Sequence, residues 1–218
     1  GISHPLAVGF AFGVAEKGRY VLSSGAKPGA KLVLTKSVGL EGASILASDF
    51  KELLAEALGW GAVERAEAFY RRLSVVPEAL AAFRAGGVQA MHDPTEGGLA
   101  GGLHELADAS QLGFKIWLEE VPFEPETLEI CRFFRLNPLA LISSGALLLA
   151  VEEEAVDRVL AAISSVGVEA KIIGETLAEP SRRLLVDRRG RERKLPAPAQ
   201  DELWKALRKA EALKAGKP

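Results

Sequence analysis

The residues best suited to chemistry lie in one short segment, 91–102, which has the sequence MHDPTEGGLAGG and combines carboxylates, a hydroxyl and a surplus of glycine. Asp93, Pro94 and Glu96 have the types and spacing of a helix start, with an acid as cap, proline at the first helical position and an acid at the third. Capping leaves the glycines unexplained, because each glycine inside a helix costs up to about 1 kcal/mol relative to alanine.

Two roles fit these glycines, which are Gly97, Gly98, Gly101 and Gly102. The helix can pack closely on a sheet, or a phosphate can bind at its N-terminus, where free N–H groups and the helix dipole favour an anion. A phosphate beside Asp93 requires a divalent cation between them, or a carboxylate already engaged in the cap. The residues alone leave both roles open.

Two further turns carry glycine and hydroxyl groups. Residues 37–42 (SVGLEG) join a predicted strand to a predicted helix, but no Gly-Lys-Ser/Thr follows, so this is not a Walker A loop. Residues 142–145 (ISSG) precede an apolar strand, and this turn either faces a ligand or is an ordinary loop.

Histidine and cysteine offer little further chemistry. His92 and His104 are too few for a metal site, and His104 has the i,i+4 spacing from Asp108 that is typical of a surface helix pair. Cys131, the single cysteine, lies in an apolar segment and is expected to be a buried thiol.

The elements that position these turns alternate between strand and helix patterns, which predicts a mixed β-sheet layered with α-helices, an α/β (α+β) fold. Expected strands cover 6–13, 19–22, 32–35, 88–91, 114–118, 146–151, 170–173 and 183–187. Expected helices cover 40–58 as one or two units, 62–73, 77–83, a segment starting at 99, 127–134, 153–164 and 200–213. We expect one domain over 1–213 and a disordered tail over 214–218.

Composition excludes several classes of function. The chain has 218 residues, a net charge of −2 and acids and bases mixed along its length, which argues against nucleic acid or an anionic membrane as partner. The basic run 188–194 surrounds a glycine turn and is expected to be a solvated hairpin tip. No apolar stretch approaches the ~20 residues that span a bilayer and no signal peptide is visible, so we expect a cytoplasmic protein. The scarcity of Asn, Cys and Met is typical of a thermophile, or of a GC-rich genome.

Taken together, the motifs resemble a known family. Residues 91–107 (MxDPTxGGLA, then LxELA) are similar to the signature of the second domain of the aminoimidazole ribonucleotide (AIR) synthase superfamily, in wording closest to hydrogenase expression/formation proteins and AIR synthase-related proteins. Residues 25–42 (GAKPGxKLVLTK, then GLEG) resemble the opening strand and glycine turn of that domain. NPL at 137–139 and SSGxLL at 143–148 follow in the family's order.

The resemblance implies a two-domain, dimeric enzyme that uses ATP to phosphorylate an amide- or carboxyl-type oxygen. It implies that an N-terminal domain, which this chain does not contain, holds ATP and Mg²⁺. The C-terminal domain lends its Asp-Pro-Thr-x-Gly-Gly loop to the cleft between domains. On that basis Asp93 and Thr95 are the candidate catalytic residues, and the candidate substrate- or phosphate-binding residues are Gly97, Gly98, Gly39, Glu41, Gly42, Ser143, Ser144 and Gly145.

Two departures leave the substrate open, as a small molecule or a protein terminus. Hydrogenase maturation proteins of this family end in a cysteine, whereas this chain ends in Lys-Ala-Gly-Lys-Pro, and they carry an acid in the turn where this chain has Ser143, Ser144 and Gly145, which looks more like selenophosphate synthetases. The first residue is Gly rather than Met, which favours a trimmed chain. The alternative function is a stand-alone, non-catalytic binding or dimerisation module.

Overall fold

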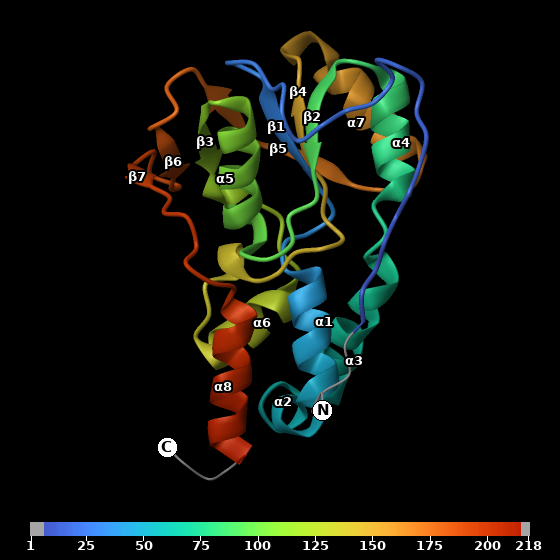
Figure 1. Cartoon of the computed structure of the whole chain (residues 1–218). Helices are drawn as coiled ribbons and strands as arrows, with labels where there is room; N and C mark the ends of the chain where they lie inside the picture. The colour runs from blue at the N-terminus through green and yellow to red at the C-terminus, as the bar shows by residue number, and fades with distance from the viewer. Residues whose placement is uncertain (1–6, 215–218) are drawn as a thin grey trace.

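A mixed sheet occupies one half of the molecule in the computed structural model, which describes residues 7–214 (Figure 1). The predicted tail therefore lies outside the described residues, apart from the backbone of Lys214. The seven strands of the described chain run in the order β2-β4-β1-β5-β3-β6-β7, and every neighbouring pair is antiparallel except β3 with β6. Their bounds are β1 Lys31–Thr35, β2 Val88–His92, β3 Gly113–Trp117, β4 Leu148–Val151, β5 Ala170–Leu177, β6 Arg183–Val186 and β7 Glu192–Lys194.

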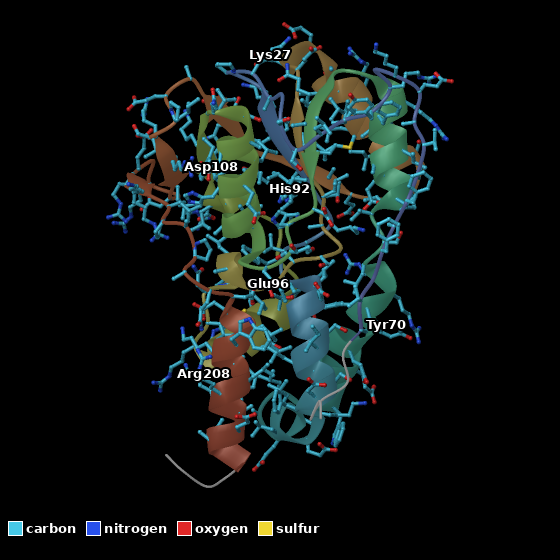
Figure 2. All side chains as sticks on the ribbon, in the orientation of Figure 1. Lys27, Tyr70, His92, Glu96, Asp108 and Arg208 are labelled. Atoms are coloured by element: carbon cyan, nitrogen blue, oxygen red, sulfur yellow. The ribbon has the colours of Figure 1, made fainter. Side chains whose placement is uncertain are left out.

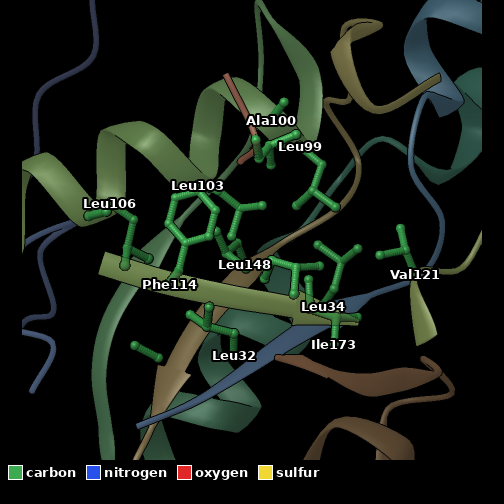
Figure 3. Close-up of a cluster of buried hydrophobic side chains, with 14 of the residues drawn as sticks. Leu32, Leu34, Leu99, Ala100, Leu103, Leu106, Phe114, Val121, Leu148 and Ile173 are labelled. Atoms are coloured by element: carbon green, nitrogen blue, oxygen red, sulfur yellow. The ribbon is translucent and has the colours of Figure 1, made fainter. Parts of the chain in front are cut away.

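Both faces of the central strands are buried, because their apolar residues alternate between two cores. Leu32 and Leu34 of β1 point to the face that α5 (Gly98–Ser110) covers with Leu99, Leu103 and Leu106 (Figure 3). Val33, between them, belongs to the opposite core under α4 (Val76–Ala85) and α7 (Val156–Ser165). The sheet is thus the middle of three layers, as the mixed α/β pattern predicts.

A separate helical cluster fills the other half of the molecule, below the sheet in Figure 1. It consists of α1 (Leu40–Asp49), α2 (Lys51–Leu58), α3 (Trp60–Glu67), α6 (Pro125–Phe134) and α8 (Glu202–Lys214). Short 3-10 turns complete the described chain: η1 Ala68–Arg72, η2 Leu118–Glu120, η3 Pro138–Ala140 and η4 Glu153–Ala155. Cys131 of α6 is buried in this cluster, which confirms the expected buried thiol, and burial raises the pKa of that thiol to about 12.

The strands expected at 6–13 and 19–22 are wrong for the described residues, since 7–22 contain neither strand nor helix. A strand needs a partner for its backbone groups, and this segment pairs with none, although the Met91 N–H donates to the Leu22 carbonyl at 3.0 Å. The hairpin expected at 188–194 is confirmed, and β7 was missing from the predicted strands. All three residues of β7 are charged and exposed, which conceals the strand pattern.

The buried carboxylate of Asp201 joins two helices across the junction of the halves. One oxygen accepts the Leu203 N–H of α8 at 2.7 Å, and the other accepts the Gly97 N–H before α5 at 2.7 Å. Asp201 is 4% exposed. Without its carboxylate, the two N–H groups would have no acceptor, because water barely reaches this place. One side chain therefore satisfies a helix start on each element.

His104 is buried under β6 and does not form the expected surface pair with Asp108. Its Nε2 lies 3.0 Å from the Leu195 carbonyl and donates to it, while its Nδ1 accepts from Arg183 at 2.6 Å. Arg183 also forms the ion pair with Asp108 that the spacing suggested for the histidine. Burial lowers the pKa of His104, and the arginine adds to this effect.

We expect Asp201→Ala to lower the free energy of unfolding by about 2–4 kcal/mol, because it removes the cap of α8 and leaves the Gly97 N–H without an acceptor. Asp201→Asn keeps one of the two acceptor oxygens and puts an NH2 donor in place of the other, so it should restore only part of the loss. Asp157→Ala, an exposed acid of α7, is the matched control. Chemical denaturation measures all three, and an Asp201→Ala loss no larger than that of the control would contradict the bridging role.

Stability should fall as the pH drops below about 6.5, because the unfolded chain binds a proton on His104 that the folded chain resists. The depressed folded pKa means that this contribution is present above pH 6.5 and lost in acid. One proton gives a slope of at most about 1.4 kcal/mol per pH unit. Denaturant unfolding between pH 5 and 8 tests this expectation, and His104→Gln should flatten the curve while lowering it throughout. An unchanged slope in His104→Gln would refute it.

Candidate functional site

Three sequence-predicted turns meet where the sheet half joins the helical half, and Ser143 connects them. The Ser143 hydroxyl accepts the Gly39 N–H at 2.9 Å and donates to the Leu141 carbonyl at 2.8 Å. Its backbone N–H donates to the Thr95 carbonyl at 3.4 Å. Ser143 is fully buried, so these bonds have little competition from water.

Close packing accounts for two of the predicted glycines. A Cβ on Gly98 would lie 2.5 Å from the Leu141 carbonyl oxygen, and a Cβ on Gly42 would lie 2.5 Å from the Leu141 side chain. Gly98 also has φ +60°, a left-handed conformation that favours glycine. Loop 139–141 can therefore lie against the starts of both α1 and α5.

The proposed cap of α5 is wrong. The helix begins at Gly98, and its cap position is Gly97, with φ +77°, rather than Asp93. The Gly97 N–H donates to Asp201, and the Gly98 N–H donates to the Thr95 carbonyl at 3.0 Å. Both groups that were expected to hold a phosphate already have acceptors within the chain, so this geometry favours packing as the reason for the glycines.

The side chains of Asp93 and Thr95 remain free of these constraints. Both residues are exposed, and neither side chain makes a hydrogen bond or ion pair with residues 7–214. Glu96, also exposed, lies at the level where the two halves meet (Figure 2). The loop thus has a backbone held by buried partners and polar side chains directed to the outside.

The remaining predicted residues lie on the two turns that Ser143 connects to this loop. Ser144 is half-buried, and Gly145 is buried beside Leu73. Glu41 is half-buried at the start of α1, its Oε2 is buried without a hydrogen-bond partner, and it lines a cavity of about 360 Å³ with Asp49 and Tyr70.

Two interactions beside the loop escaped the sequence analysis. His92, at the end of β2, lies 2.7 Å through Nε2 from the Glu105 carboxylate and 3.0 Å through Nδ1 from the Ser23 hydroxyl, which holds the strand end that leads into Asp93. Asp201 directly precedes α8, which begins at Glu202, whereas the expected helix begins at residue 200 and so places this acid inside the helix instead of at its cap. The partner of His92 at residue 23 has no local sequence signal, because it is 69 residues away.

Between residues 7 and 214 there is no group of three or more His, Cys, Asp or Glu side chains arranged to hold a metal ion. In the same part of the chain, no helix has the length and apolar character needed to span a bilayer.

Comparison with known proteins places this arrangement in a family. Residues 27–187 match the model of the AIR synthase related protein, C-terminal domain. A carbamoyl dehydratase HypE from Rhizobium leguminosarum bv. viciae is 34% identical over 169 residues, which cover 77% of this chain and 46% of that protein. The chain spans about half the length of the curated relatives it matches.

Solved structures agree with this assignment. A crystal structure of Escherichia coli HypE superimposes with a TM-score of 0.68 at 27% identity, covering 86% of this chain and 55% of that one. A structure of the hydrogenase maturation protein HypE in complex with ATP has a TM-score of 0.63 at 23% identity, covering 84% of this chain and 55% of that one, and shows the shared fold. The motifs, the layered sheet and the matched family model agree, and the chain belongs to the AIR synthase-related proteins as their C-terminal domain.

Proposed function

We propose that this chain is the C-terminal half of an ATP-dependent enzyme that phosphorylates an amide- or carboxyl-type oxygen. The relatives support this proposal, because they include proteins named carbamoyl dehydratase and a HypE solved with ATP. ATP with Mg²⁺ would supply the phosphoryl group. Because the N–H groups of Gly97 and Gly98 are engaged within the chain, we place most of the nucleotide on a second domain.

The observation that carries the proposal is the loop of Asp93 and Thr95. Its backbone is tied through the Thr95 carbonyl to buried Ser143, while its carboxylate and hydroxyl are exposed and unpaired. A rigid backbone with free polar groups suits a loop that completes a site across a cleft. Asp93 would orient the reacting oxygen or accept its proton, and Thr95 would donate a hydrogen bond. Ser144 and Glu41 lie on neighbouring segments and would contact the substrate, whose identity we leave open.

Segment 7–14 exposes apolar side chains that could pack against another part of the protein. Val8, Phe10, Phe12 and Val14 alternate along it and are 86–91% exposed. This is the pattern of a half-buried strand whose sheet lies in another polypeptide segment. We propose the upstream half of the protein as that sheet, within a homodimeric enzyme.

The coding sequence upstream of Gly1 separates the enzyme from the stand-alone module. Another ~100 residues or more, the size of a domain, would support the enzyme half. A start codon a few codons upstream would refute it and leave the binding or dimerisation module.

Asp93→Ala should lower ATP turnover by about 100-fold in the protein that includes the upstream half, because a group positioned at the reacting atoms contributes at least that much. The exposed side chain makes no bond within residues 7–214, so the midpoint of thermal unfolding should not change. Asp157→Ala, on α7, is the control for removing an exposed acid. Turnover within twofold of the control would remove Asp93 from the mechanism.

Replacing Phe10 and Phe12 together by Asp should leave the thermal stability of the 218-residue chain unchanged, because both rings are exposed in it. The same change should weaken binding to a separately produced upstream half by about 100-fold or more, since two buried aromatic rings are lost. Lys17→Asp, in the turn that follows, is the control. Titration calorimetry measures both affinities, and equal affinities would contradict the proposal that segment 7–14 binds the upstream half. Sedimentation of the chain alone reports whether a second copy takes the same surface.

A further inference from the structure

A second cavity lies next to Lys36 and Ser37, and none of the ten predicted site residues lines it. Its volume is about 900 Å³, within the range of small-molecule sites. Five segments meet there: the end of β1, η1, the start of α4, the 121–124 turn and the 166–171 connection into β5.

Lys36 organises the inner wall of this cavity. Its Nζ donates to the carbonyls of Arg72 and Ser74 at 3.0 and 2.8 Å and forms an ion pair with Glu78 at 2.6 Å. Lys36 has φ +53°, a left-handed conformation that costs a non-glycine residue about 1–2 kcal/mol. Local strain of this kind persists where the surrounding contacts demand it, and it gathers at functional sites.

Both oxygens of the Glu78 carboxylate are buried without a hydrogen bond, and Oε1 has an ion-pair partner in Lys36. The Glu78 side chain is 1% exposed. Two interactions stabilise its negative charge, namely its place in the first turn of α4 and the ion pair of Oε1 with Lys36. Oε2 has no donor among the described residues. A buried acceptor without a donor costs about 1–3 kcal/mol, so this atom calls for an N–H or O–H group from outside the chain.

The outer wall carries an excess of positive charge. Of its four cations, Lys36 pairs with Glu78, and Arg72 pairs with Glu124 at 2.8 Å. Arg71 and Lys171 form no ion pair within residues 7–214, and Glu169 is the remaining acid of the lining. An anionic group in the cavity would therefore find two cations without an ion-pair partner, and the Glu78 carboxylate lines the same cavity.

We propose that this cavity binds a small phosphorylated or carboxylated molecule that also carries a hydroxyl or amino group. Arg71 and Lys171 contact the anion, and Glu78 Oε2 accepts the hydroxyl or amino hydrogen. The site is separate from the proposed catalytic loop and does not depend on its function.

Amide NMR of the 218-residue chain tests the proposal with three probes: glycerol 3-phosphate, glycerate and inorganic phosphate at equal ionic strength. Glycerol 3-phosphate or glycerate should give saturable shifts at Lys36, Arg71 and Val168, and the stronger of the two identifies the anion. Inorganic phosphate, which lacks the polyol hydroxyls, should bind about tenfold more weakly.

Arg71→Gln and Lys171→Gln should each weaken the better probe by about fivefold to tenfold, and the exposed Arg84→Gln on α4 should leave it unchanged. Glu78→Gln should remove the preference over inorganic phosphate. Because that change can also loosen Lys36, its folding is checked by thermal unfolding, and the Arg71 and Lys171 variants decide the result if it fails to fold. The absence of saturable shifts, or shifts equal in all variants, overturns the proposal. So does a crystal soaked with the probes that shows only water on Glu78 Oε2.

Discussion

The hydroxyl of Ser143 is the interaction on which the junction of the molecule depends. It accepts from the start of α1 and donates to the 139–141 loop, and the N–H of the same residue donates to the loop before α5. A buried hydroxyl with both its donor and its acceptor roles filled defines one geometry, because any shift leaves a polar group unpaired. Gly42 and Gly98 make this geometry possible, since a Cβ at either position would collide with Leu141.

The charged side chain of Asp201 is buried at the same junction. Asp201 satisfies the starts of α5 and α8, so the helical half is attached to the sheet half by a carboxylate rather than only by apolar contact. The carboxylate also takes a position that an anion would otherwise find attractive, at the N-terminus of α5. The inner side of the glycine-rich segment therefore packs closely on its neighbours, and its outer side exposes free polar groups.

Two surfaces of the chain are left incomplete in different ways. The 7–14 segment exposes alternating apolar side chains, which is a demand for another sheet. The cavity at Lys36 contains an unpaired buried oxygen and unpaired cations, which is a demand for a polar ligand. Exposed apolar side chains and buried polar atoms without hydrogen bonds are distinct physical signals, and here they lie on separate segments.

The sequence by itself determined most helices, the central strands and the family, because hydrophobic period and the order of three glycine turns are local properties of the chain. It misplaced the strands at 6–13 and 19–22, because a strand pattern does not say where its partner lies. It also placed the cap of α5 at Asp93 and paired His104 with Asp108. Only the tertiary structure assigned these roles, since Asp201 and Arg183 approach from distant segments, and no local spacing encodes which donor meets which acceptor.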